Sequence, residues 1–120
     1  MFPFHTLPGR RPARVRIIAA AGFSLALLAA APARAETVQV TIDNFTFGPK
    51  DVTVKPGDTV TWTNRDDIPH NVRAALGAGT WKCAVMDTGG TCDITFKEAG
   101  EFKYFCALHP HMTGTVIVKP

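Results

Sequence analysis

Three residues that can bind a soft metal ion stand at short, regular spacing near the end of the chain. Cys106, His109 and Met112 form a C-x2-H-x2-M pattern, in a chain of 120 residues with only 3 Cys, 4 His and 3 Met. A thiolate, an imidazole and a thioether are soft to borderline ligands, and a His2Cys set with a weak axial Met is the donor set of a blue-copper electron-transfer site. The spacing therefore predicts one mononuclear copper ion.

The motif provides only one of the two imidazoles that such a site needs. His70 is the natural candidate for the second, because it follows Ile68-Pro69 in the connection after an expected strand. His5 lies in a segment that we expect to be removed. His111 is expected to be exposed or to face a partner, since an isolated histidine is more often a surface group than a ligand.

The elements that must position these residues are predicted to be short β-strands, because apolar residues alternate with polar ones between turn signals. The clearest expected strands are 37–43, 52–54, 59–63, 93–96, 101–105 and 115–119. This pattern favours an all-β sandwich or barrel with little helix. The stretch 74–90 is expected to be a long connection with at most a helical turn. The Cys-His-Met motif is expected in a loop between two strands.

The first 35 residues have the features of a secretory signal. Residues 1–35 carry five Arg and no acid, an apolar run covers residues 17–31, and Ala33-Arg34-Ala35 fits an A-x-A cleavage site. We expect cleavage after Ala35, export to the bacterial periplasm and no membrane anchor, since the apolar run is short for a span. The pair Arg10-Arg11 suggests the twin-arginine export route as an alternative, but the residues after the pair favour the general secretory route.

The remaining chain, residues 36–120, is mildly acidic. It holds eight Lys and Arg against ten Asp and Glu, so its charge is −2 and the basic character of the whole chain belongs to the leader. Nothing in this balance indicates binding to nucleic acid. The charged residues Arg65, Asp66 and Asp67 are expected to form a solvated turn.

The two other cysteines, Cys83 and Cys92, are nine positions apart. Two cysteines in an oxidising compartment favour a disulfide, which would help to stabilise a domain of this small size. The alternative is a second copper site made of Cys83, Met86 and Cys92, which would need both thiols to stay reduced.

Four segments together resemble the type 1 copper proteins, or cupredoxins, and the short ligand loop is most similar to that of the amicyanins. The segments are Phe45-Thr-Phe-Gly-Pro49, the stretch Val54 to Asn64, Pro69-His-Asn-Val72 and the Cys106–Met112 motif. The resemblance covers nearly all of residues 36–120. It implies a Greek-key β-sandwich of about eight strands and outer-sphere electron transfer.

The resemblance also implies a role for individual residues. His70, Cys106 and His109 would be the equatorial copper ligands, and Met112 would be the axial ligand. Asn71 would tie the two ligand-bearing segments together.

The resemblance to amicyanins further implies redox partners. The apolar surroundings of the site would dock them transiently through the rim residues Leu108, Pro110 and His111, with methylamine dehydrogenase as donor and a c-type cytochrome as acceptor. The chain departs from the amicyanin pattern at Leu108, at His111 and at the two extra cysteines. These departures affect the expected identity of the partner more than the expected copper site. We expect a monomer.

Two alternative functions can be compared with the composition of the chain. A module for copper storage, delivery or resistance would need an open or Met-rich site, whereas residues 36–120 hold only two Met. An enzyme such as a nitrite reductase or multicopper oxidase would need further copper held by several more His. The sequence therefore favours a one-electron carrier that is not an enzyme.

Overall fold

The computed structural model describes residues 34–120 and the four single residues 3, 9, 13 and 22. The predicted leader, 1–35, otherwise lies outside the described residues. The chain divides into two units, Met1–Ala30 and Ala31–Pro120, and the fold below is that of the second unit. In the described part of the chain, no helix has the length and apolar character needed to cross a membrane.

Residues 34–120 form nine β-strands and, within that range, no helix. The strands are β1 (Thr37–Asp43), β2 (Thr46–Gly48), β3 (Asp51–Val54), β4 (Thr59–Asn64), β5 (His70–Ala74), β6 (Lys82–Met86), β7 (Thr91–Thr95), β8 (Gly100–Cys106) and β9 (His109–Val118).

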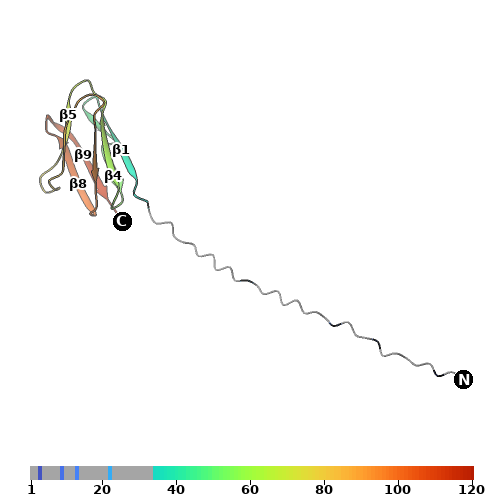
Figure 1. Ribbon diagram of the computed structural model, residues 1–120. Helices are drawn as coiled ribbons and strands as arrows, with labels where there is room; N and C mark the ends of the chain where they lie inside the picture. The colour runs from blue at the N-terminus through green and yellow to red at the C-terminus, as the bar shows by residue number, and fades with distance from the viewer. Residues whose placement is uncertain (1–2, 4–8, 10–12, 14–21, 23–33) are drawn as a thin grey trace. The chain divides into compact units, whose positions relative to one another are not determined.

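The strands build two sheets that face each other, as Figure 1 shows. One sheet has the order β2-β1-β4-β7 and the other has the order β3-β9-β8-β5-β6. Two pairs, β1 with β4 and β3 with β9, are parallel, and the remaining pairs are antiparallel. The expected all-β sandwich is confirmed.

The core between the sheets follows from the alternation of apolar residues. In β4, every second side chain is buried, and Val60 and Trp62 are fully inaccessible. Val40, Ile42 and Val116 meet them from β1 and β9. Burying each aliphatic side chain of this kind contributes roughly 1.5–3 kcal/mol, so this alternation fixes which face of each strand turns inward.

Two expectations for the middle of the chain are wrong. The stretch 74–90 contains β6 and no helical turn, and the segment that begins at His70 is β5 rather than part of a loop. The alternation is weak in β6, where the neighbours Ala84 and Val85 are both exposed. Burial does alternate in β5, but its buried positions hold His70 and Ala74 beside Val72, so the sequence carries little apolar alternation there.

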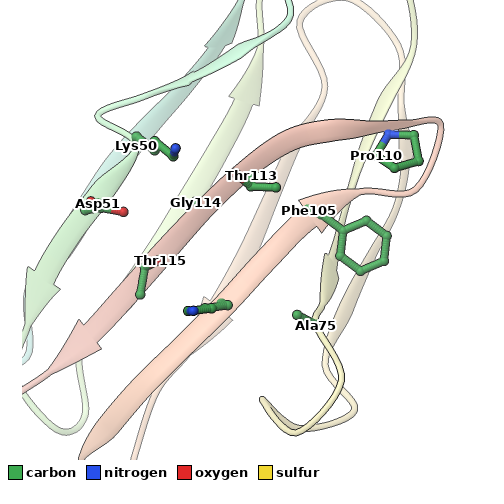
Figure 2. A pocket seen from close by; sticks show the side chains of 9 residues that line it. Lys50, Asp51, Ala75, Phe105, Pro110, Thr113, Gly114 and Thr115 are labelled. Atoms are coloured by element: carbon green, nitrogen blue, oxygen red, sulfur yellow. The ribbon is translucent and has the colours of Figure 1, made fainter.

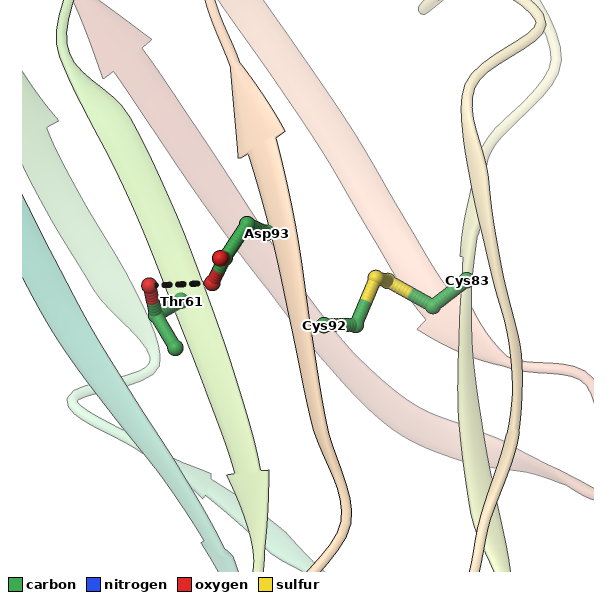
Figure 3. Close-up of a disulfide and its surroundings, with 4 residues drawn as sticks. All are labelled: Thr61, Cys83, Cys92 and Asp93. Atoms are coloured by element: carbon green, nitrogen blue, oxygen red, sulfur yellow. Dashed lines mark hydrogen bonds between the residues drawn. A yellow bond between two sulfur atoms is a disulfide. The ribbon is translucent and has the colours of Figure 1, made fainter.

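The expected disulfide is confirmed. It joins Cys83 of β6 to Cys92 of β7, and so links the edge strand of one sheet to the edge strand of the other (Figure 3). Next to Cys92, the paired strands β4 and β7 are also joined by side chains, because Thr61 Oγ1 donates a hydrogen bond to Asp93 Oδ1 at 2.6 Å. The alternative of a second copper site at Cys83 and Cys92 is wrong, because the disulfide bond consumes both thiols.

Candidate metal centre

A tight hairpin brings Cys106 and His109 together. Cys106 ends β8 and His109 begins β9, and the two residues pair across a turn made only of Ala107 and Leu108. Cys106 and His109 therefore lie on paired strands, but the register shifts beside them and residues 110–112, which include Met112, have no partner on β8. The loop expected for the motif is thus present only in part. Before this shift, β8 and β9 pair regularly from Gly100 to Phe105, which anchors the hairpin in the sheet.

His70 completes a cluster of three donors. It is the first residue of β5, a neighbour of β8 in the same sheet. Its Nδ1 lies 3.7 Å from the Cys106 Sγ, and the His109 Nδ1 lies 3.7 Å from the same sulfur. The three donor atoms all lie within 4.8 Å of one another, so one ion at their centre could contact all three.

The chemistry of the cluster fits copper. Cys106 and His70 are fully buried and His109 is half-buried, so solvent reaches the three donor residues only at His109. Cys106 is the chain's free cysteine. Met112 follows on β9 with its side chain buried, and it adds a thioether to the hairpin. Two imidazoles, one thiolate and one thioether make the donor set of a type 1 copper site.

Asn71 links β5 to the hairpin that carries Cys106 and His109. Its side-chain Oδ1 accepts a hydrogen bond from the Ala107 N–H at 2.7 Å. Its own N–H donates to the Cys106 Sγ at 3.4 Å. Asn71 therefore fixes the hairpin against β5 and contacts the sulfur of Cys106 directly.

Asp66 holds the buried histidine in one orientation. Its Oδ2 lies 2.7 Å from the His70 Nε2, and its side chain is only 11% exposed. A carboxylate can only accept, so Nε2 carries the proton and Nδ1 is left free to face Cys106. The expectation of a solvated turn at Asp66 is wrong. The sequence did carry one sign of this contact, because an acid stands four positions before the histidine. A turn rich in charged residues is usually solvated, however, which favoured the other interpretation.

The pKa of the Asp66 carboxyl is held below its ordinary value. Burial acts to raise this pKa, but hydrogen bonds from the Phe45 N–H, the His70 ring and the Asn44 N–H outweigh it. Asp66 is therefore ionised at neutral pH and acts as an acceptor.

The connection that carries Asp66 is ordered by a buried amide. Asn64 is fully buried, and its Nδ2 donates to the carbonyls of Ile68 and Met86, each at 2.9 Å. Its Oδ1 accepts from the Asp66 N–H at 3.0 Å. Every polar atom of this side chain is thus satisfied, as a buried amide requires. The result is a fixed path from β4 to His70.

Phe45 is a site neighbour for which the sequence predicted no role, although it begins the segment 45–49 that resembles the cupredoxins. Its ring centroid lies 5.7 Å from that of His70 and 5.2 Å from that of His109, and it is nearly perpendicular to both. The two imidazole centroids are 4.9 Å apart. Phe45 itself is 52% exposed, so one side of its ring covers the histidines and the other faces solvent.

The expected rim residues all lie at the surface. Leu108, Pro110 and His111 are exposed around the end of the hairpin. A hollow of about 190 Å³ lies beside His111, and Phe45 and Met112 are also among its lining residues.

A larger hollow, of about 540 Å³, lies elsewhere, along β3, β8 and β9 (Figure 2). Phe105 and Pro110 line it, as do Lys50 and Lys103, but none of the three donor side chains does. The larger hollow is therefore not the metal centre.

Comparison with known proteins agrees with this geometry. Residues 34–119 match the family model described as "Copper binding proteins, plastocyanin/azurin family". The chain is 39% identical over 95 residues to amicyanin of Paracoccus versutus, a match that covers 77% of this chain and 72% of the relative. It is 38% identical over 123 residues to the chloroplastic plastocyanin of Tetradesmus obliquus, covering 92% of this chain and 82% of that one.

Solved structures give the same result. A point mutant of amicyanin in its reduced state superposes with a TM-score of 0.65 at 37% identity, covering 69% of this chain and 82% of that one. A purple cupredoxin from Nitrosopumilus maritimus gives a TM-score of 0.63 at 30% identity, covering 68% and 99%. The chain belongs to the plastocyanin/azurin family of copper-binding proteins, and its cofactor is copper.

Proposed function

We propose that this chain is a one-electron carrier that binds a single copper ion through His70, Cys106, His109 and Met112. The observation that carries the proposal is the position of both His Nδ1 atoms, each 3.7 Å from the Cys106 Sγ. The first three residues would be equatorial ligands and Met112 the axial one. The bound ion would supply reversible exchange between Cu(II) and Cu(I), while the protein sets the geometry and the access.

The residues around the donors favour a site that changes little between oxidation states. Asp66 fixes the His70 ring, Asn71 fixes the hairpin, and the hairpin fixes Cys106 and His109. Ligands that are held in this way cannot relax far, and outer-sphere transfer is fastest when little reorganisation is needed.

The surface around His109 supports docking of a redox protein. His109 is the half-buried ligand, and the exposed Leu108 and Pro110 lie next to it in the chain, with His111 beyond. A small apolar rim suits a weak and transient encounter, since redox complexes have interfaces at the low end of the size range. Electrons would pass through the exposed edge of the His109 ring.

We propose methylamine dehydrogenase as the donor and a c-type cytochrome as the acceptor. The support is the similarity to amicyanins, together with a methylamine utilization protein of Methylophilus methylotrophus that is 31% identical over 87 residues. We also propose that the mature chain is a periplasmic monomer, exported after cleavage behind Ala35. The A-x-A pattern of residues 33–35 and the basic, apolar leader support this.

The test is to add one equivalent of Cu(II) to residues 36–120 and to record the visible and electron paramagnetic resonance spectra. We expect an intense blue band and a narrow copper hyperfine splitting, both of which need an equatorial thiolate. Cys106→Ser should abolish both. A pale solution with an ordinary tetragonal spectrum would instead mean that Cys106 is not equatorial, and would favour a storage or delivery role.

A further inference from the structure

The turn between β1 and β2 has an unfavourable backbone conformation. Asn44 and Phe45 have φ values of 48° and 57°, the only positive φ angles of non-glycine residues within the described part of the chain. A two-residue hairpin turn of this type usually takes Asn followed by Gly. Asn44 fits the rule, but a bulky Phe in the left-handed region is a strained exception.

One carboxylate stabilises this strained turn. The Asn44 N–H donates to Asp66 Oδ1 at 2.6 Å, and the Phe45 N–H donates to Asp66 Oδ2 at 2.9 Å. The same Oδ2 lies 2.7 Å from the His70 Nε2. We call these three hydrogen bonds the Asp66 brace. They connect the turn directly to the buried histidine of the metal centre.

The strained backbone conformation of Phe45 holds its ring over the most exposed part of the site. His109 is the donor that is only half-buried, and the Phe45 ring lies over it and over His70. A strained residue persists when its surroundings over-determine it, and such residues concentrate at functional sites. Glycine at this position would relieve the strain but would leave both imidazoles uncovered.

We propose that Phe45 is a positioning and shielding residue of the copper site, which restrains the His109 ring and limits the access of water and competing ligands, and that Asp66 holds it there. This inference rests on the proposed ligand set. The Asp66 brace thus acts in two directions, by orienting His70 and by holding Phe45 over the imidazole pair.

The test compares Phe45→Gly with Phe45→Ala. Both remove the ring, but only glycine relieves the backbone strain. With Cu(II) bound, both variants should lose copper to excess ethylenediaminetetraacetate faster than the wild type, by about tenfold, the effect typical of residues that orient metal ligands. Leu76→Ala removes a fully exposed apolar side chain from the turn between β5 and β6 and should leave the rate unchanged.

The metal-free chain gives a second readout. Phe45→Gly should unfold at a higher urea concentration than Phe45→Ala, because it alone removes the strain. Nuclear Overhauser contacts between the Phe45 and His109 rings should be present in the metal-free wild type. Equal unfolding midpoints for the two variants, or missing ring contacts, would overturn the geometry on which the inference rests.

The role of Asp66 is tested by a double-mutant cycle. If Asp66 acts partly through Phe45, then Asp66→Asn should speed copper loss less in the Phe45→Gly background than in the wild type. Equal effects in both backgrounds would overturn the link between Asp66 and Phe45.

Failure of the inference is distinguishable from failure of the proposed function. A wild-type chain without the blue band would overturn the ligand set. A wild-type chain with the band, together with unchanged copper loss in both Phe45 variants, would overturn only the shielding role.

Discussion

The two histidines of the metal centre are held in different ways. His70 is fully buried, with Nε2 bound to Asp66 and Nδ1 turned toward Cys106, so neither ring nitrogen has freedom to change partner. His109 is half-buried and is restrained mainly by its place in the hairpin and by the Phe45 ring. His70 is therefore the firmly held donor of the cluster, while His109 is the donor nearest the surface.

The two methionines of the described chain allow a sharp test of the axial ligand. Met86 and Met112 are both buried, at 5% and 4% exposure, and the Cα of Met86 pairs with that of His70. The hairpin carries Met112 alone, so Met112→Leu should keep an equatorial thiolate band but shift it and change the reduction potential. Met86→Leu, a substitution of the same size, should leave both unchanged. Absorption spectra and cyclic voltammetry of the two variants make the comparison.

The outcome is decisive because both substitutions replace a thioether by an apolar group of similar volume, which should cost less than about 1.5 kcal/mol of stability. A spectral change in the Met86 variant alone would assign the axial position to Met86 and contradict the spacing argument.

At the scale of strands, the sequence predicted elements well where one face is buried and the other exposed. The alternation in 37–43 and 59–63 corresponds to β1 and β4 almost residue for residue. It failed for β5, whose buried positions hold the polar His70 and the small Ala74, and for β6, where the adjacent Ala84 and Val85 are both exposed. It also expected the whole metal-binding motif in a loop, whereas Cys106 and His109 pair across a two-residue turn and only residues 110–112 are unpaired.

The sequence predicted the donors and one of their supports, Asn71, but not the supports Asp66 and Phe45. Scarce residue types at fixed spacing identified Cys106, His109 and Met112. Asp66 and Phe45 belong to abundant residue types, and their contacts with His70 join parts of the chain 4 and 25 positions apart, counted from the residue numbers. Only the fold brings the turn between β1 and β2 beside β5.

The disulfide between β6 and β7 is an element-scale support, because it joins strands of different sheets. Replacing both cysteines, as Cys83→Ala with Cys92→Ala, removes a cross-link between residues nine positions apart. In the chain-entropy model this should lower the free energy of unfolding by roughly 2–3 kcal/mol. Urea unfolding of the metal-free chain at neutral pH measures the change.

The control for the disulfide is reduction of the metal-free wild type with dithiothreitol, which should give a similar loss without any change of sequence. An unfolding midpoint that moves in neither case would mean that the link between the sheets adds nothing to stability.

At the scale of the whole domain, β8 and β9 contribute both to the site and to the centre of the core. Tyr104 lies two residues before Cys106 on β8 and is buried, with its hydroxyl donating to the Lys50 carbonyl at 3.4 Å. It pairs with Gly114 of β9, where any Cβ would overlap the phenol. The aromatic rings of Trp62 and Phe47 pack against it from the opposite sheet.

This environment predicts a pH limit for the fold. Burial, together with the negative charge of Asp51, raises the pKa of Tyr104 to about 12. Because the pKa of the phenol is higher in the folded state than in the unfolded chain, where it is about 10, the phenol stabilises the folded state fully below pH 10. This contribution is lost as the pH rises through 12. A pKa difference of about two units corresponds to roughly 3 kcal/mol of the free energy of unfolding.

Tyr104 is the only tyrosine of the chain, so phenolate absorbance reports on it directly. We expect this absorbance to appear near pH 12 or together with unfolding, and never near pH 10 in a folded chain. Between pH 10 and 12 the free energy of unfolding should fall more steeply for the wild type than for Tyr104→Phe, which shares every other titrating group. A phenolate that forms near pH 10, while circular dichroism still reports the native sheets, would show that the phenol is not sealed between the sheets.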